Sequence, residues 1–196
     1  MGKIKSALEI ALERTESVAS DKSSIGQFDA KQKGKKLANE FLGGAVKSLE
    51  EEMKKTPEEG LASLKQGIFD ILISQIALPA VKEEIKRVEA AGQGLGVIIG
   101  GKRFGEIAKQ MLQLLNQYLN EAAQYEDAIK KQYAPKLRQK EEELSRRFGR
   151  QVKLDPFQDP EFTAFFNQNM NALKANYESA LEQIREEAKR LFYDPG

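Results

Sequence analysis

The stretch that decides the fold is residues 159–193, DPEFTAFFNQNMNALKANYESALEQIREEAKRLFY. Apolar side chains recur in it at seven-residue spacing, and a second set completes the same face: Met170, Tyr177, Ile184 and Leu191, with Phe166, Leu173 and Ala180. This spacing is typical of a helix that pairs with another along a coiled-coil seam. Asp159 is a good N-cap residue and Pro160 suits the first turn. We therefore predict one long helix from Pro160 to about residue 193.

A second seam precedes it, with apolar residues alternating at four and three positions: Phe104, Ala108, Met111, Leu115, Tyr118, Ala122, Tyr125 and Ile129. Pro135 interrupts this seam, and we expect the helix to continue beyond it as a mostly solvated projection that reaches Phe148 and stops at Gly149. Two long helices joined by a short polar connection can bury their apolar seams against each other if the chain folds back. Residues 103–193 are therefore predicted to form an antiparallel helical hairpin.

The amino-terminal part also shows helical periodicity. Residues 3–20 should form an amphipathic helix, which Ser23, Ser24 and Gly26 interrupt. A second helix is expected from Phe28, bent or broken by Gly34 and by Gly43–Gly44.

Two further helices are predicted before the hairpin. Thr56 is placed as the N-cap of a helix with Pro57 in its first turn and Glu59 completing a capping box. Residues 61–76 are apolar almost all round, so this helix should be the central, most buried one, ending near Leu78 because of Pro79. A shorter helix should follow, with Gly92 capping it in the left-handed conformation.

The stretch GVIIGGKR, residues 96–103, nearly matches a phosphate-binding loop, G-x-x-x-x-G-K-[ST]. Arg103 replaces the hydroxyl residue, and the preceding segment is helical and charged where such a loop needs a buried strand. The density of glycines favours a hinge or loop over residues 92–102, although close packing of a glycine-bearing helix is the alternative.

These patterns predict an all-α protein, a helical bundle with a long antiparallel, coiled-coil-like C-terminal hairpin. We expect an N-terminal helical region over 1–91, a glycine-rich hinge or loop over 92–102 and the hairpin over 103–196. The hairpin and the N-terminal region could also form one continuous domain.

Composition limits the chemistry. The 196 residues include 31 Lys plus Arg against 30 Asp plus Glu, a formal net charge of +1, with no cysteine and no histidine. Disulfides, thiolate nucleophiles, the usual zinc ligand sets and imidazole bases are thereby excluded. We assign no catalytic, cofactor-binding or metal-binding residue and expect no cofactor. No segment is apolar for the roughly 20 residues that a bilayer requires, and a chain without cysteine suits the reducing cytoplasm.

The connection between the two seams, SRRFGRQVKLDPFQDPEF, is the best candidate for a partner-binding surface. Basic residues beside exposed aromatics are typical of contact surfaces. The candidate residues are Arg146, Arg147, Phe148, Arg150, Lys153 and Phe157. The alternative is that the apolar residues here only seal the end of the hairpin.

The segments KIKSALEIALERT and APKLRQKEEEL, with DPEF opening the last helix, resemble small bacterial helical proteins grouped as a family of unknown function. The resemblance covers most of the chain and implies no activity or ligand.

The leading hypothesis for function is a non-enzymatic structural or adaptor protein that acts through protein–protein interaction or self-association. One alternative is a nucleotide- or phosphate-binding enzyme that uses the loop Gly96–Lys102. Another is a nucleic-acid- or ribosome-associated protein that uses the tip arginines or the basic cluster Lys31, Lys33, Lys35 and Lys36.

Overall fold

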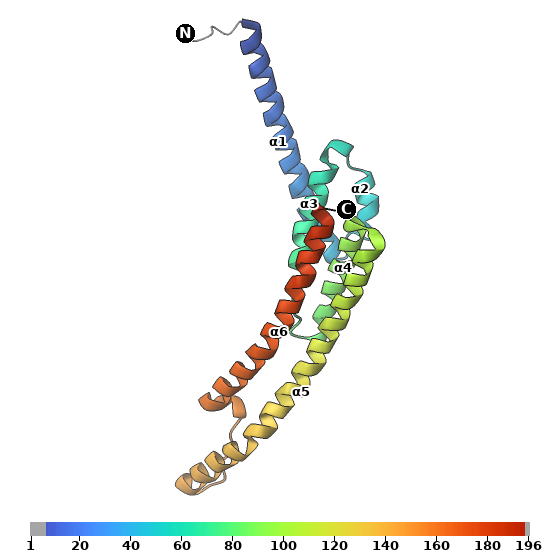
Figure 1. The fold of residues 1–196 in the computed structure, drawn as a ribbon. Coiled ribbons are helices and arrows are strands. Elements are labelled where there is room, and N and C mark those ends of the chain that lie inside the picture. Colours follow the sequence, from blue (N-terminus) through green and yellow to red (C-terminus); the bar gives the residue numbers. More distant parts are fainter. Residues whose placement is uncertain (1–6, 195–196) are drawn as a thin grey trace. The chain divides into compact units, whose positions relative to one another are not determined.

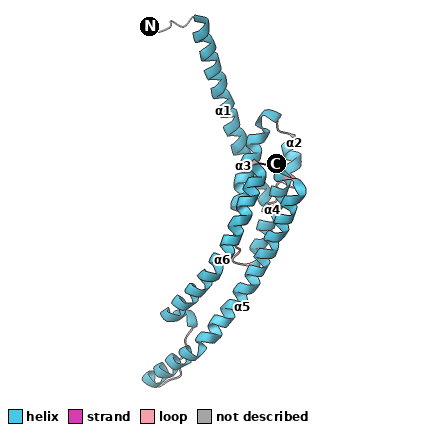
Figure 2. Cartoon of the chain, viewed as in Figure 1, coloured by secondary structure: helices cyan, strands magenta, loops and turns pink. Residues whose placement is uncertain are grey.

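The computed structural model describes residues 7–194, with side chains from residue 24 onward. The first residues of the helix predicted over 3–20 lie outside this range. The described chain is all-α, without a strand (Figures 1 and 2). Its α-helices are α1 (Ala7–Leu42), α2 (Leu49–Lys54), α3 (Glu58–Ser74), α4 (Ile85–Ile99), α5 (Gly101–Phe148) and α6 (Pro160–Tyr193), with 3₁₀ turns at Lys82–Glu84 and Pro156–Gln158. Within the described range, no helix is long and apolar enough to cross a membrane.

The chain divides into two compact units. The first runs up to Ile76 and includes Glu89–Lys102. The second consists of Ala77–Val88 together with the chain from Arg103 onward.

In the first unit, α1 and α3 cross at two glycines. A Cβ added at Gly34 of α1 would overlap the carbonyl oxygen of Leu64, and one added at Gly67 of α3 would overlap that of Lys31. Backbones can approach this closely only where no side chain intervenes. Fully buried side chains of α3, among them Leu64, Ile68 and Leu72, fill the core of this unit.

The predicted break after residue 20 was wrong, because α1 is continuous from Ala7 to Leu42. Gly26 lies within this helix and costs it only about 1 kcal/mol relative to alanine, which a long helix tolerates. Gly34 does not break α1 either, and it lies at the crossing with α3. The predicted break at Gly43–Gly44 is confirmed, and Gly44 has a positive φ of 78°.

The predicted cap of α3 was also wrong. The N-cap residue is Pro57, with no side-chain cap hydrogen bond, and the buried Oγ1 of Thr56 has no hydrogen-bond partner. The extended conformation of Pro57 (ψ 148°) moves the helix start one residue further than expected. The helix ends at Ser74, earlier than expected. Its apolar side chains are also less completely buried than predicted, because Ile71 and Ile73 are only half-buried.

The glycine-rich segment is mostly helix, which corrects the prediction of a hinge or loop over 92–102. α4 runs through Gly92, Gly94 and Gly96 to Ile99. A Cβ on Gly94 would lie 2.7 Å from Leu72 Cδ1 and 3.1 Å from Phe41 Cε1. This close packing offsets the low helix propensity of glycine. The break is confined to Gly100 and Gly101, whose φ angles are 73° and 78°.

The second unit contains the predicted antiparallel hairpin of α5 and α6. The rings of Tyr118 and Tyr177 lie 5.2 Å apart, and so do those of Tyr133 and Phe162, so the residue numbers rise along one helix as they fall along the other. α5 passes through Pro135 and ends at Phe148, and Gly149 follows with a φ of 64°. These features confirm the sequence prediction for the hairpin.

Candidate contact surface at the hairpin tip

The tip, defined here as residues 145–158, comprises the end of α5 and most of the connection to α6. Side chains of α5 accept hydrogen bonds from the backbone of this connection. The Val152 N–H donates to Ser145 Oγ at 2.8 Å, and the Leu154 N–H donates to Glu141 Oε1 at 2.8 Å. Further along, Asp155 caps the 3₁₀ turn by accepting from the Phe157 N–H at 3.0 Å. Side chains therefore satisfy three backbone N–H groups of the connection, and two of these bonds link it to α5.

Four of the predicted contact residues are exposed cations, and they differ in their partners. Arg146 lies 3.6 Å from Glu142 in an exposed ion pair. Arg147, Arg150 and Lys153 form no ion pair with any residue that the structure describes. These three cations are available to an outside partner.

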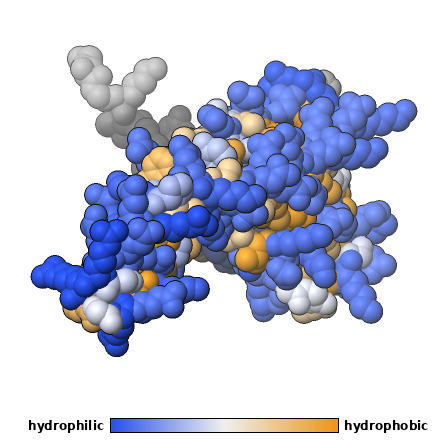
Figure 3. All heavy atoms as spheres, turned by 90° about the horizontal axis from the view of Figure 1, so that it is seen from below, coloured by the Kyte–Doolittle hydropathy of each residue, from blue (hydrophilic) through white to orange (hydrophobic). Residues whose placement is uncertain are grey.

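The two predicted aromatic contacts also differ. Phe148 is 61% exposed and has no ring neighbour within the described chain. Phe157 is 47% exposed, but its ring meets those of Phe162 and Phe166 edge-on at 5.2 Å. Phe157 thus helps to seal the hairpin, as the alternative interpretation expected, while Phe148 stays exposed. Figure 3 shows one face of the molecule, which is mainly hydrophilic with apolar areas between the polar residues.

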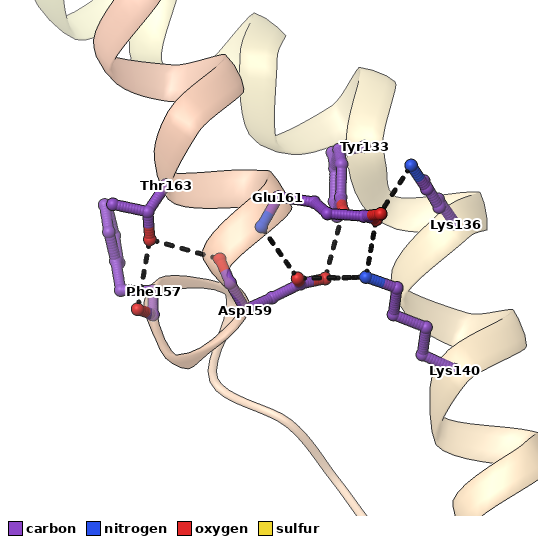
Figure 4. A network of polar contacts seen from close by, with 7 residues as sticks. All are labelled: Tyr133, Lys136, Lys140, Phe157, Asp159, Glu161 and Thr163. Atoms are coloured by element: carbon purple, nitrogen blue, oxygen red, sulfur yellow. Dashed lines mark hydrogen bonds and ion pairs between the residues drawn. The ribbon is translucent and has the colours of Figure 1, made fainter.

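Behind the tip, Asp159 forms the centre of a polar network that sequence reasoning missed (Figure 4). Its carboxylate is buried and accepts from Lys140 Nζ at 2.9 and 2.8 Å and from the Tyr133 hydroxyl at 3.0 Å. It also accepts from the Glu161 N–H at 3.1 Å, which confirms the predicted N-cap. Glu161 in turn contacts Lys136 and Lys140 at 2.9 and 2.7 Å. The network joins the start of α6 to α5.

The network shifts the pKa values of its members. Hydrogen bonds from Lys140 and then Lys136 lower the pKa of Glu161 to about 2. The hydrogen bond from Lys140 also lowers the pKa of Asp159, and its bonds to Asp159 and Glu161 raise the pKa of Lys140. Lys140, Asp159 and Glu161 are therefore all charged at neutral pH and stabilise one another's charges. This is a structural role.

The glycine-rich segment lacks the geometry of a phosphate-binding loop, and two of the four lysines of the basic cluster are in ion pairs. Residues 96–99 belong to α4, so no loop follows a strand there, and Lys102 lies in the first turn of α5. In the basic cluster, Lys31 pairs with Asp70 at 2.9 Å and Lys36 with Glu40 at 3.7 Å. Among the described residues, no group of three or more acidic side chains could hold a metal ion.

A family model described as a family of unknown function (DUF6657) matches residues 50–190. The chain belongs to this family. No curated protein and no solved structure matches it. The DUF6657 match confirms the resemblance to a family of unknown function, and it spans α2 to most of α6, which includes the whole tip.

The first prediction concerns the network of this DUF6657 protein. Asp155→Ala and Asp159→Ala each remove a carboxylate that caps a turn beginning with proline. Only Asp159→Ala also removes the buried acceptor that Lys140 and the Tyr133 hydroxyl share, which leaves Glu161, at 2.7 and 3.4 Å, as the acceptor for both. Losing these buried hydrogen bonds is costly. We expect Asp159→Ala to lower the melting temperature clearly more than Asp155→Ala, as measured by circular dichroism. Equal decreases in melting temperature would show that the hydrogen bonds from Lys140 and Tyr133 add no stability beyond that of the N-cap.

The second prediction is a pH dependence. Because the pKa of Glu161 is lowered from 4.5 to about 2, its ionised form stabilises the fold above about pH 4.5, and this contribution is lost as the pH falls towards 2. The melting temperature of Glu161→Gln should therefore lie below that of the unmodified chain at pH 6, and the difference should close as the pH falls through this window. A difference that stayed constant down to about pH 2 would contradict the assignment.

Proposed function

We propose that this DUF6657 protein is a non-enzymatic structural or adaptor protein that acts through protein–protein contact or self-association, with the tip as its contact surface. The observation that carries the proposal is the set of exposed cations without ion pairs, Arg147, Arg150 and Lys153, beside the exposed ring of Phe148. Arginine and aromatic residues contribute most strongly to binding at protein interfaces.

The anchoring of the tip supports the same proposal. Since Ser145 and Glu141 already fix the backbone of residues 152 and 154, a partner would have little loop entropy to remove on binding. A loop ordered in advance can present its side chains at low cost. A cytoplasmic location is part of this proposal, because a chain without cysteine is suited to a reducing compartment.

The experiment combines a light-scattering mass with affinity capture, comparing the unmodified chain with the double variant Arg147→Glu and Arg150→Glu. We expect either a self-associated species or a captured protein, reduced in the double variant at an unchanged melting temperature. Arg138→Glu, on an exposed arginine of α5 outside the tip, is the control and should behave like the unmodified chain. A strict monomer that captures no protein would contradict the proposal.

A further inference from the structure

A pocket of about 440 Å³ lies within the second unit, and none of its lining residues belongs to the tip. Three segments form its walls: the middle of α5, the first half of α6 and residues 78–80 of the connection between α3 and the 3₁₀ turn at Lys82–Glu84. Small-molecule sites are concave and have volumes of about 300 to 1,000 Å³. The pocket therefore suits a compact ligand at the lower end of that range.

The seam of the hairpin carries a small residue at the level of the pocket. Along α5, Tyr118 and Ile129 are buried in the seam, whereas Ala122 between them has no side-chain atom beyond Cβ and lines the pocket. On α6, the half-buried side chains of Phe166 and Met170 line the same pocket. Protein interiors are close-packed, and unfilled apolar space costs stability. The hairpin thus leaves open an apolar space that a larger seam residue would fill.

The third wall of the pocket is a non-helical segment with local constraints. The Ala80 N–H donates to Glu84 Oε2 at 2.7 Å. The neighbouring Pro79 is buried and lines the pocket, and its ring fixes the φ angle at that position. A ligand would therefore lose less free energy to the ordering of this wall than to the ordering of an unconstrained loop.

Polar side chains of α6 line one side of the pocket. Asn167, Asn171 and Lys174 are spaced four and three residues apart, which places them on one face of the helix. They are exposed, and none of the three side chains has a hydrogen-bond or ion-pair partner among the residues that the structure describes. Two amide groups and one ammonium group are therefore available as hydrogen-bond donors.

The acidic groups near this face are already engaged. Among the lining residues in the described chain, Glu126 is the only acid, and it pairs with Lys130 at 2.6 Å. Glu178, one helical turn beyond Lys174, pairs with Arg185 at 2.9 Å. The lining of the pocket therefore carries one uncompensated charge, the positive charge of Lys174, which favours a ligand with one negative charge.

We propose that this pocket binds a small monocarboxylic acid with an apolar body. The carboxylate accepts hydrogen bonds from Lys174 and from the amides of Asn167 and Asn171. The apolar body lies against Ala122 and Met170, where it removes apolar surface from water. Phosphate fits less well, because it has no apolar part and carries more charge than a single lysine balances. This binding site is separate from the tip and goes beyond the proposed function.

The test is titration calorimetry of the full chain with octanoate and with octanol, an uncharged analogue of the same chain length. We expect both to bind, and octanoate to bind more tightly. Lys174→Met keeps most of the aliphatic side chain and removes the charge. Octanoate should bind this variant about fivefold more weakly, the effect of one ion pair at an exposed lysine, while octanol binding should not change. Lys131→Met, at an exposed position of α5 outside the pocket, is the matched control.

A second variant, Ala122→Leu, tests the location of the site. The leucine side chain should fill the pocket and weaken the binding of both ligands about tenfold, because the apolar body loses contact area. Its melting temperature should equal or exceed that of the unmodified chain.

Four outcomes would overturn the inference. They are no octanoate binding at millimolar concentration, equal weakening of both ligands by Lys174→Met, unchanged octanoate binding by Ala122→Leu, and a clearly lower melting temperature of Ala122→Leu, which would show that no space is free there. The Arg147→Glu and Arg150→Glu double variant should bind octanoate as the unmodified chain does. A failure at the pocket therefore leaves the proposed function of the tip untouched.

Discussion

Gly67→Ala is expected to destabilise the first unit by about 2 to 3 kcal/mol, although alanine is the better helix former. The added Cβ would overlap the Lys31 carbonyl oxygen and lie 3.0 Å from the Lys35 nitrogen. Both are backbone atoms, so no rotamer change relieves the overlap, and α1 and α3 must move apart. Gly34→Ala tests the same crossing from the other helix and should have a similar effect. The measurement is urea denaturation followed by circular dichroism.

The control for this substitution is Gly105→Ala in α5, where an added Cβ meets no atom within 4 Å. This change should leave stability equal or raise it by about 0.5 to 1 kcal/mol, because alanine loses less conformational entropy on folding than glycine does. If Gly67→Ala behaved like Gly105→Ala, the close crossing of α1 and α3 would be refuted.

Phe162→Ala should destabilise the hairpin by about 3 to 5 kcal/mol. The Phe162 side chain is fully buried, and its ring centroid lies 5.2 Å from those of Tyr133 and Phe157 and 5.8 Å from that of Phe166. Removing this ring opens a cavity at the point where α6 begins to pack on α5. Urea denaturation followed by circular dichroism measures this decrease in the free energy of unfolding.

Phe148→Ala is the matched control, since it removes the same ring from a position that is 61% exposed. We expect its effect on the free energy of unfolding to stay within about 0.5 kcal/mol. A loss comparable to that of Phe162→Ala would mean that Phe148 is packed structure, and it would remove the main apolar residue from the contact surface.

The hairpin could be predicted from sequence because its signals are local or periodic. The seven-residue spacing of Met170, Tyr177 and Ile184 indicated which face of α6 is apolar, and Asp159–Pro160 indicated where the helix begins. Neither inference needed knowledge of a distant residue.

The glycine-rich segment could not be predicted in this way. Whether Gly94 breaks a helix or allows close packing depends on Phe41, Leu49 and Leu72, which are far away in the sequence. Propensity alone favoured a loop, and tertiary packing reversed the outcome. The continuity of α1 past Gly26 was missed because a single glycine costs little in a long helix.

At the candidate site, composition favoured the tip as a contact surface but could not distinguish the exposed aromatic residue from the packed one. Phe148 and Phe157 look alike in sequence, and only the rings that surround Phe157 distinguish them. The network around Asp159 joins residues 19 to 26 positions apart. The spacing of Tyr133, Lys136 and Lys140, three and four residues, places them on one face of α5 and was the available signal.

The most direct test of the tip as a contact surface is photo-crosslinking in cells that produce the full chain. A photoreactive phenylalanine analogue replaces Phe148 in one sample and Gln124, an exposed residue of α5 outside the tip, in another. We predict a discrete crosslinked protein, identified by mass spectrometry, from position 148 and not from position 124, and its loss when Arg147→Glu and Arg150→Glu are added. No crosslink from position 148, or one that the double variant leaves unchanged, would contradict the account.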